Sequence, residues 1–491
     1  MSKRFIPLSA AHHVPDSSLT HKSKNSTALV SGLAVLCGIV CVGSGPLAHS
    51  ENLAQIYQAA LAHDPLYREA RARFNAAKEQ RPAAWAALLP HISASAEKLW
   101  DKSSGASDQV ISDVNGALYS YNLSTLSHTN SSMWSVDFSD TLFSWKDWMA
   151  LKGSEKKVAQ ARAQYQAAKE QLLLRTTKAY FGALDRIEQL HAQKSAYDAL
   201  DYQLKRERAA YSVGLVAKIA VQQAEAARDD SAAAIVRDEQ LLTNAQNKLQ
   251  AITGETYASL MGPGDALPLI APNPLNEQYW VKLSLSHNWT LIAKELSLDA
   301  ARYTVRSTYG ADLPEIQLIA SRSYSNSISN QTIFGQEFTG LGTNDSDEQV
   351  GIEVTVPIFD GGADLANTHR AQYEENLAQA ALTAAARGAR EATENAYLGV
   401  LSGIANVKAS SAAVLANKTA FNASQAGLKS GAESEMDYLN TLSNLIMART
   451  QYARSRYTYL ESIFALKKAT GTLTPAAILQ VNQWLTRPEA P

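Results

Sequence analysis

Histidine could give this 491-residue chain catalytic or metal-binding chemistry, and ten histidines are present. None stands in an H-E-x-x-H pattern, which would place two imidazoles on one helix face for zinc. His63 in "HDPLYREAR" and His287 in "HNWTLIAKE" share a local context, and we interpret each as a residue that starts a helix. The segment "GPGDA" at 262–266 is interpreted as a turn, because no lysine-bearing helix follows it as in a phosphate loop. We therefore predict no catalytic residue, no metal, no cofactor and no enzyme.

The two cysteines, Cys37 and Cys41, lie within the apolar run at 28–43, after a basic start and before small residues. This pattern predicts that residues 1–50 are a secretory signal peptide, and the run is shorter than the roughly 20 residues of a membrane anchor. Leu36 and Val40 precede the cysteines where a lipid-attachment site needs a small residue, so no lipid anchor is expected. No later apolar run reaches the length of a membrane-spanning helix, and none is expected. The balance of 45 Lys and Arg against 47 Asp and Glu gives no electrostatic case for nucleic acid.

The remaining chain is an internal duplication. "ALLPHISASA" (87–96) resembles "ADLPEIQLIA" (311–320), "AYFGAL" (179–184) resembles "AYLGVL" (396–401), and "LQAITG" (249–254) resembles "LKKATG" (466–471). Each half reads as helix, strand, loop, strand and helical hairpin. We predict a first repeat at 51–260 (strands about 90–104 and 131–144, hairpin about 147–254), a linker at 261–286, a second repeat at 287–474 (strands about 314–325 and 348–359, hairpin about 363–471) and a C-terminal equatorial segment at 475–491.

Two of the predicted strands alternate between apolar and polar residues, with Asp140 as the one exception on an apolar face. In "QVGIEVTVPIF" Val350, Ile352 and Val354 share one face and Glu353 lies on the other, while Asp137 takes the polar face of "MWSVDFSDTLF". Such strands fit the wall of a membrane β-barrel, although a soluble sheet alternates in the same way. Asp137 and Glu353 would then face a water-filled lumen. Four strands cannot close a barrel. Two protomers would therefore share a barrel of eight strands, or three protomers a barrel of twelve.

The loops between paired strands, roughly 104–130 and 326–347, are rich in Ser, Asn, Gly and Asp, so we expect them to be flexible and solvated. The segment at 147–211 has no proline and only two glycines, and it predicts a helix of roughly 100 Å, with a counterpart at 363–429. Gly214 in "AYSVGLVAK" and Gly431 in "GLKSGAESEMD" are expected to turn each helix back on itself. The fold class is thus mainly α with a β-barrel portion.

These motifs together resemble the TolC family of trimeric outer-membrane channels. The resemblance rests on "ENLAQIYQAALAHDP", "LLPHISASA", "LFSWKD", "VPIFDGG", "YSVGLVAKIAVQQAEA" and "YLESIFALKKATGTL", and covers about 51–485. It implies a homotrimer with a twelve-stranded barrel in outer-membrane lipid of a Gram-negative bacterium and a helical tunnel across the periplasm. A periplasmic adaptor and an inner-membrane transporter of the ABC or RND type would be its partners. Drugs or secreted proteins would leave through it.

The resemblance also implies roles for residues at the two turns. Adaptor docking would fall on Val213, Gly214, Leu215, Ser430 and Gly431. The family's tunnel closure uses acidic, tyrosine and arginine side chains, and here Ala220, Leu428, Glu433 and Asn440 stand at positions of an Asp, a Tyr, an Arg and an Asp, whereas Asp437 matches. Leu428, Glu433, Asp437 and Asn440 are accordingly our candidates for an apolar or weakly acidic gate.

Two other classes of protein remain as alternatives. A periplasmic adaptor also has long helical hairpins, but it would need one hairpin and a β-rich domain rather than two hairpins and four long strands. A structural coiled-coil protein of the envelope would account for the helices and leave the alternating strands unexplained.

Overall fold

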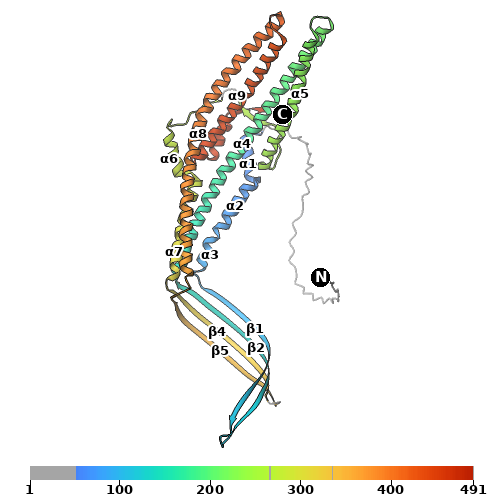
Figure 1. The fold of residues 1–491 in the computed structure, drawn as a ribbon. Helices are drawn as coiled ribbons and strands as arrows, with labels where there is room; N and C mark the ends of the chain where they lie inside the picture. Colours follow the sequence, from blue (N-terminus) through green and yellow to red (C-terminus); the bar gives the residue numbers. More distant parts are fainter. Residues whose placement is uncertain (1–50, 265–266, 334–335, 490–491) are drawn as a thin grey trace, which may run out of the picture. The chain divides into compact units, whose positions relative to one another are not determined.

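The computed structural model describes residues 51–264, 267–333 and 336–489, and the predicted signal peptide lies outside them. Within this part, two helical hairpins dominate (Figure 1). The first is α4 (Trp145–Ser212) with α5 (Lys218–Thr253), and the second is α8 (Ala363–Ser430) with α9 (Glu435–Ala469). α4 and α8 have 68 residues each, which corresponds to roughly 100 Å at 1.5 Å per residue.

Shorter helices precede the strands in each half of the chain. They are α1 (Leu53–His63), α2 (Pro65–Lys78) and α3 (Gln80–Ala86) in the first half, and α6 (Glu277–His287), α7 (Trp289–Tyr309) and the 3₁₀ turn Gly310–Asp312 in the second. His63 and His287 end α1 and α6, so their interpretation as helix-start residues was wrong. The next residue starts the following helix, because Asp64 accepts from Tyr67 N at 2.6 Å and Asn288 from Thr290 N at 2.9 Å.

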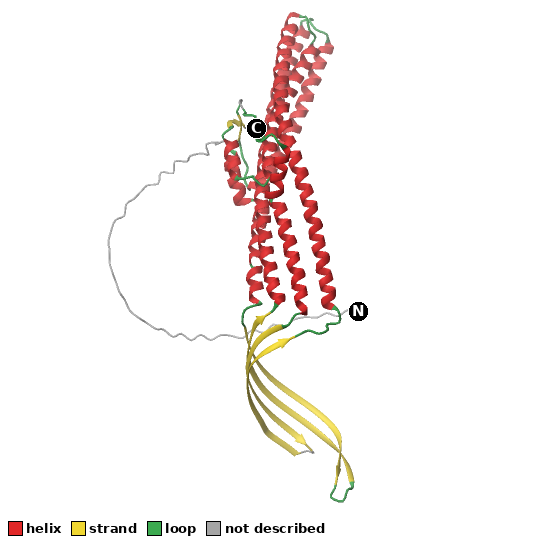
Figure 2. Ribbon diagram, turned by 90° about the vertical axis from the view of Figure 1, so that its left-hand side faces the viewer, coloured by secondary structure: helices red, strands yellow, loops and turns green. Residues whose placement is uncertain are grey.

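The main sheet is antiparallel and has four strands in the order β1-β2-β4-β5. Their bounds are β1 His91–Ser112, β2 Leu118–Phe143, β4 Glu315–Ile333 and β5 Gln336–Thr355. Figure 2 shows these strands as one curved sheet that continues from the ends of the helices. A small second sheet pairs β3 (Leu260–Pro263) with β6 (Leu485–Glu489).

The strands are much longer than the sequence predicted. The stretches 104–130 and 326–347, expected as flexible loops, are mostly paired strand. β1 and β2 pair along the whole of β1 and are joined by a tight turn around Asp113–Gly116. Between 356 and 359, where a strand was expected to continue, none is present. The stretches 104–130 and 326–347 are rich in Ser, Thr and Asn on both faces, so they lack the alternation by which a strand is recognised in sequence.

The pairing register determines which side chains share a face. Directly opposed residues lie on the same side of a sheet, and Asp137 opposes Ser321 while Val136 opposes Arg322. Glu353 opposes Gln317 and Ile352 opposes Leu318. Asp137 and Glu353 therefore lie on one polar face, as the alternation predicted. Val136, Leu318 and Ile352 lie on the other face, which is mainly apolar and which we call the aliphatic face, although it also carries Asp140 and the ion pair of Arg322 with Glu348.

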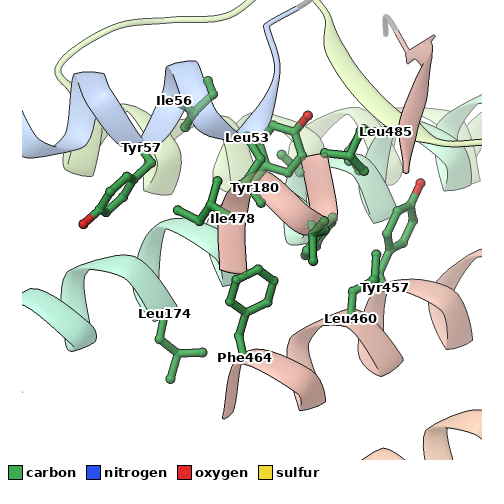
Figure 3. Packing of buried hydrophobic residues seen from close by; sticks show 14 of the residues in the cluster. Leu53, Ile56, Tyr57, Leu174, Tyr180, Tyr457, Leu460, Phe464, Ile478 and Leu485 are labelled. Carbon is green, nitrogen blue, oxygen red and sulfur yellow. The ribbon is translucent and has the colours of Figure 1, made fainter. Parts of the chain in front are cut away.

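A hydrophobic core lies where α1, α4, α9 and α10 (Pro475–Asn482) meet the small sheet, and α5 and α8 contribute to it (Figure 3). Leu53, Ile56, Phe464 and Ile478 are among its fully or almost fully buried members. Tyr180 is buried in it, and its hydroxyl donates to the Met261 carbonyl at 2.6 Å. This core ties the start of the described chain, the middle of both hairpins and the C-terminal segment into one unit.

One stretch of α8 is apolar enough, by length and composition, to cross a membrane, which corrects the expectation that no such segment exists. The alanine-rich sequence raises its mean hydropathy although polar residues interrupt every continuous apolar run. The stretch belongs to a helix that packs against α7 and α9, and at 68 residues α8 is far longer than the roughly 20 residues of a bilayer span.

Candidate functional site

The turn between α4 and α5, the first of the two hairpin turns, is a Schellman motif centred on Gly214. Its φ of 81° is left-handed, which favours glycine. Leu215 N donates to Ala210 O at 2.9 Å and Gly214 N donates to Tyr211 O at 3.0 Å, so the last carbonyls of α4 are satisfied. Val213 and Leu215 remain 69% and 78% exposed. The turn therefore presents apolar side chains on a rigid backbone.

The second turn-back repeats the motif at Gly431, whose φ is 77°. Ala432 N donates to Gly427 O at 2.8 Å and Gly431 N donates to Leu428 O at 3.2 Å. Ser430 is exposed, and its hydroxyl donates to Gly427 O at 3.0 Å. Both turns lie at the end of the hairpins opposite to the sheet (Figure 1).

The four gate candidates lie together around the second turn but differ in exposure. Leu428 is half-buried, whereas Glu433, Asp437 and Asn440 are exposed. Asp437 has a role that the sequence did not reveal, because it forms a capping box with Ser434 at the start of α9. Its carboxylate accepts from Ser434 Oγ at 2.6 Å and from Ser434 N at 3.3 Å.

Close to the turns, a buried polar cluster links the two hairpins, and sequence reasoning missed it. Arg206 of α4 lies 3.2 Å from Glu207 Oε1 and 3.2 Å from Glu435 Oε2 of α9. Gln203 donates to Glu207 Oε1 at 2.8 Å. The side chains of Glu207 and Glu435 are only 5% and 12% exposed. The signal in the sequence was a polar pair four residues apart, Gln203 and Glu207, on the buried face of α4.

The cluster holds two carboxylates for one guanidinium, and its electrostatics follow from this imbalance. Burial, followed by repulsion from Glu207, raises the pKa of Glu435 from 4.5 to about 7, although Arg206 opposes the shift. Glu435 Oε1 is buried without a hydrogen-bond partner. The same neighbourhood raises the pKa of Tyr438, first by burial and then by the charge of Glu435. This contact between the hairpins therefore changes its charge near neutral pH.

Further polar contacts hold each hairpin together along its length. In the first, Gln193 donates to Ser231 Oγ at 2.9 Å and Arg208 lies 2.9 Å from Glu225. In the second, the hydroxyls of Ser410 and Ser455 are 2.8 Å apart and buried. In the part of the chain that the structure describes, no group of three or more His, Cys, Asp or Glu side chains is arranged to hold a metal ion.

A protein-family comparison identifies this architecture. The model of the outer membrane efflux protein family matches residues 56–255 and 280–472, which is well over half of the chain. The chain belongs to the outer membrane efflux protein family. Its relatives place this family member in the outer membrane.

Individual relatives agree with this assignment. Over 463 residues the chain is 28% identical to Outer membrane protein TolC of Escherichia coli K12, covering 93% of this chain and 89% of that protein. It is 27% identical to the alkaline protease secretion protein AprF of Pseudomonas aeruginosa, covering 86% of this chain and 84% of that protein. Among solved structures, the CmeC outer membrane channel of Campylobacter jejuni matches with a TM-score of 0.71 at 18% identity, covering 88% and 89% of the two chains. The last match supports the fold alone.

Proposed function

We propose that three copies of this outer-membrane protein form the exit duct of an export machine. Each copy would contribute four strands to a twelve-stranded barrel and two hairpins to a helical tunnel in the periplasm. The observation that supports this most strongly is the four-stranded sheet, one face of which is mainly apolar. Among the described residues no strand lies beyond β1 or β5. Open strand edges are not tolerated in lipid, so the edges must be paired by other copies.

In this proposal the aliphatic face meets lipid and the polar face with Asp137 and Glu353 lines the lumen. Both carboxylates are exposed and have polar neighbours, since Ser135 Oγ donates to Asp137 at 2.8 Å and Thr355 Oγ1 to Glu353 at 3.3 Å. A solvated channel accommodates such groups at little cost, whereas lipid does not.

The turns at the far end are proposed as the docking face for a periplasmic adaptor, with Val213, Gly214, Leu215, Ser430 and Gly431 as its contact residues. An inner-membrane transporter of the ABC or RND type would complete the machine. AprF is named for protease secretion and PrtF of Dickeya chrysanthemi for the secretion of proteases, whereas BepC of Brucella suis is named an efflux protein. Both secreted polypeptides and small toxic compounds are therefore candidate cargo, and the duct itself carries out no chemistry.

Leu428, Glu433, Asp437 and Asn440 are proposed to narrow the tunnel at the second turn, where their copies would approach one another around the symmetry axis. The pairing of Arg206 with Glu435 supports this, because it couples the position of the second hairpin to the first within one copy. The tunnel would then open when the second hairpin moves away from the first, which requires the contact between Arg206 and Glu435 to break.

Cross-linking tests the shared barrel. Residues 51–491 contain no cysteine, so introduced cysteines can be followed without background. Ser95→Cys in β1 would be combined in turn with Asp347→Cys, Gln349→Cys or Gly351→Cys in β5. Oxidation of membranes should give a ladder that ends at the trimer for at least one pair. A ladder that ends at the dimer would indicate an eight-stranded barrel, and monomers for all pairs would refute closure between copies.

Docking is tested at Leu215→Cys and Ala432→Cys, which avoid the left-handed glycines. Photo-cross-linkers attached there in intact cells should capture a periplasmic protein, identified by mass spectrometry. The matched control is Ala106→Cys in β1, at the opposite end of the molecule. Capture of the same protein at the control position, or none at the turns, would contradict the proposal.

A further inference from the structure

The junction of the sheet with the helices contains an aromatic pocket that the duct function does not use. It has a volume of about 430 Å³ and is lined mainly by Trp85, Leu88, Leu142, Phe143, Trp145 and Trp148. This volume falls in the range of ligand pockets, roughly 300–1,000 Å³. The rings of Trp85 and Trp148 are 6.3 Å apart, and both side chains are 44% exposed. So much exposed apolar surface in one place indicates a partner.

The pocket is continuous with the aliphatic face of the sheet because of a bulge in β2. Thr141 opposes Gln317, but after the register shift Phe143 opposes Ile316, which itself opposes Val354. The shift therefore turns Phe143 onto the aliphatic face, where an unbroken register would have placed it on the polar one. The pocket thus begins where the membrane-facing surface ends.

Two cations flank the pocket on its helical side. Lys152 Nζ lies 5.9 Å from the centroid of the Trp148 ring. Lys152 and Arg81 both contact Glu155, each at 3.4 Å, so these three side chains together carry a net positive charge. Lys152 and Arg81 are 42% and 63% exposed and can reach an added anion.

We propose that this pocket binds one glycerophospholipid of the periplasmic leaflet. The glycerol and the acyl carbons nearest to it would pack on the tryptophans, and the phosphate would lie beside Lys152 and Arg81. Three observations select this occupant: continuity with the lipid-facing surface, aromatic rings with polar edges that suit the membrane–water boundary, and a positive charge next to them. The inference rests on the proposed insertion of the sheet into the membrane.

Tryptophan quenching tests the insertion of the sheet into the membrane and the binding of a lipid in the pocket separately. The trimer is placed in nanodiscs of phosphatidylethanolamine and phosphatidylglycerol, with or without bromine on the acyl carbons nearest the glycerol. Bromine quenches only tryptophans that it can contact. The quenched part of the emission should fall in Trp85→Phe/Trp148→Phe and stay unchanged in Trp280→Phe, whose indole donates to Pro274 O beside the hairpins.

Trp134→Phe separates the two possible failures, because Trp134 lies on the aliphatic face against Tyr324. Loss of quenching in Trp134→Phe but not in the double variant would leave membrane insertion intact and overturn the lipid site, as expected if a second copy of the chain fills the pocket. Unchanged quenching in both variants would overturn the lipid site together with insertion.

Native mass spectrometry tests the phosphate contact. Trimers released from the nanodiscs should retain phosphatidylglycerol, and Arg81→Gln or Lys152→Gln should weaken retention about fivefold each, since one cation beside an anionic lipid is worth about 1 kcal/mol. Lys205→Gln is the matched control, because Lys205 is an exposed lysine that pairs with Asp201 near the turns. Equal retention by all three variants would overturn the headgroup contact.

Discussion

Replacement of Glu435 by glutamine should make the contact between the two hairpins independent of pH. In the folded protein the pKa of Glu435 is about 7, against 4.5 for an unperturbed glutamate. Between these values the folded state binds more protons than the opened state. The free energy of opening is therefore highest below pH 4.5, falls as the pH rises through 7, and is level above it.

The size of the effect follows from the shift. The rise of the pKa from 4.5 to about 7 sets an upper limit of roughly 3.5 kcal/mol, since each tenfold change in an acid constant is worth about 1.4 kcal/mol. Relaxation of the ionised cluster reduces this, so we expect about 1–3 kcal/mol. Glutamine reproduces the neutral carboxyl in shape and leaves Arg206 paired with Glu207. Glu435→Gln should consequently stabilise the contact at pH 8 and leave it unchanged at pH 4.

Hydrogen–deuterium exchange of the first turns of α9 measures this opening, once corrected for the intrinsic pH dependence of exchange. Wild-type protection should drop roughly 5- to 150-fold between pH 4 and pH 8, and the glutamine variant should show no such drop. Glu433→Gln is the matched control, because Glu433 is an exposed acid in the same turn, and it should behave like wild type. A drop of equal size in Glu435→Gln and wild type would refute the reasoning.

Three further substitutions probe packing, backbone strain and burial, each measured as the denaturation midpoint of the purified protein at fixed pH. Gly403→Ala should lower stability by about 1–3 kcal/mol, because the added Cβ would lie 3.2 Å from Tyr459 Cα between α8 and α9. Gly431→Ala, whose added Cβ would have nothing within 4 Å, should cost only the roughly 1–2 kcal/mol of left-handed backbone strain. A larger loss of stability in Gly431→Ala than in Gly403→Ala would contradict this. Asp64→Ala should cost about 3 kcal/mol, because Asp64 is 1% exposed, caps α2 and pairs with Arg175 at 2.9 Å; a loss below 0.5 kcal/mol, the size expected for an ordinary surface change, would refute it.

Local signals in the sequence were sufficient for the helical hairpins. Long alanine-rich segments without proline predicted α4 and α8, and the two glycines predicted where they reverse. A left-handed residue can be recognised from one position, because only glycine adopts that conformation without strain. The alternation around Val350–Val354 likewise indicated which residues share a face, since the period of a strand is two.

Local signals in the sequence did not predict the lengths of the strands. Residues 104–112 and 118–130 have no consistent apolar face, and only pairing between strands made them regular. Such pairing satisfies backbone hydrogen bonds whatever the side chains are, so a serine-rich segment that reads as a loop can extend a hairpin. The register between β2 and β4 joins residues about 200 positions apart and has no local signature.

By itself the sequence determined the family, the order of the elements and the positions of the two turns, because these depend on short motifs and periodicity. Only the tertiary structure decided that Glu435 meets Glu207 and Arg206, and that a bulge brings Phe143 beside Trp85 and Trp148. Each of these depends on side chains brought together from different elements, and the charge and exposure of a side chain are set by those neighbours rather than by its own position in the chain.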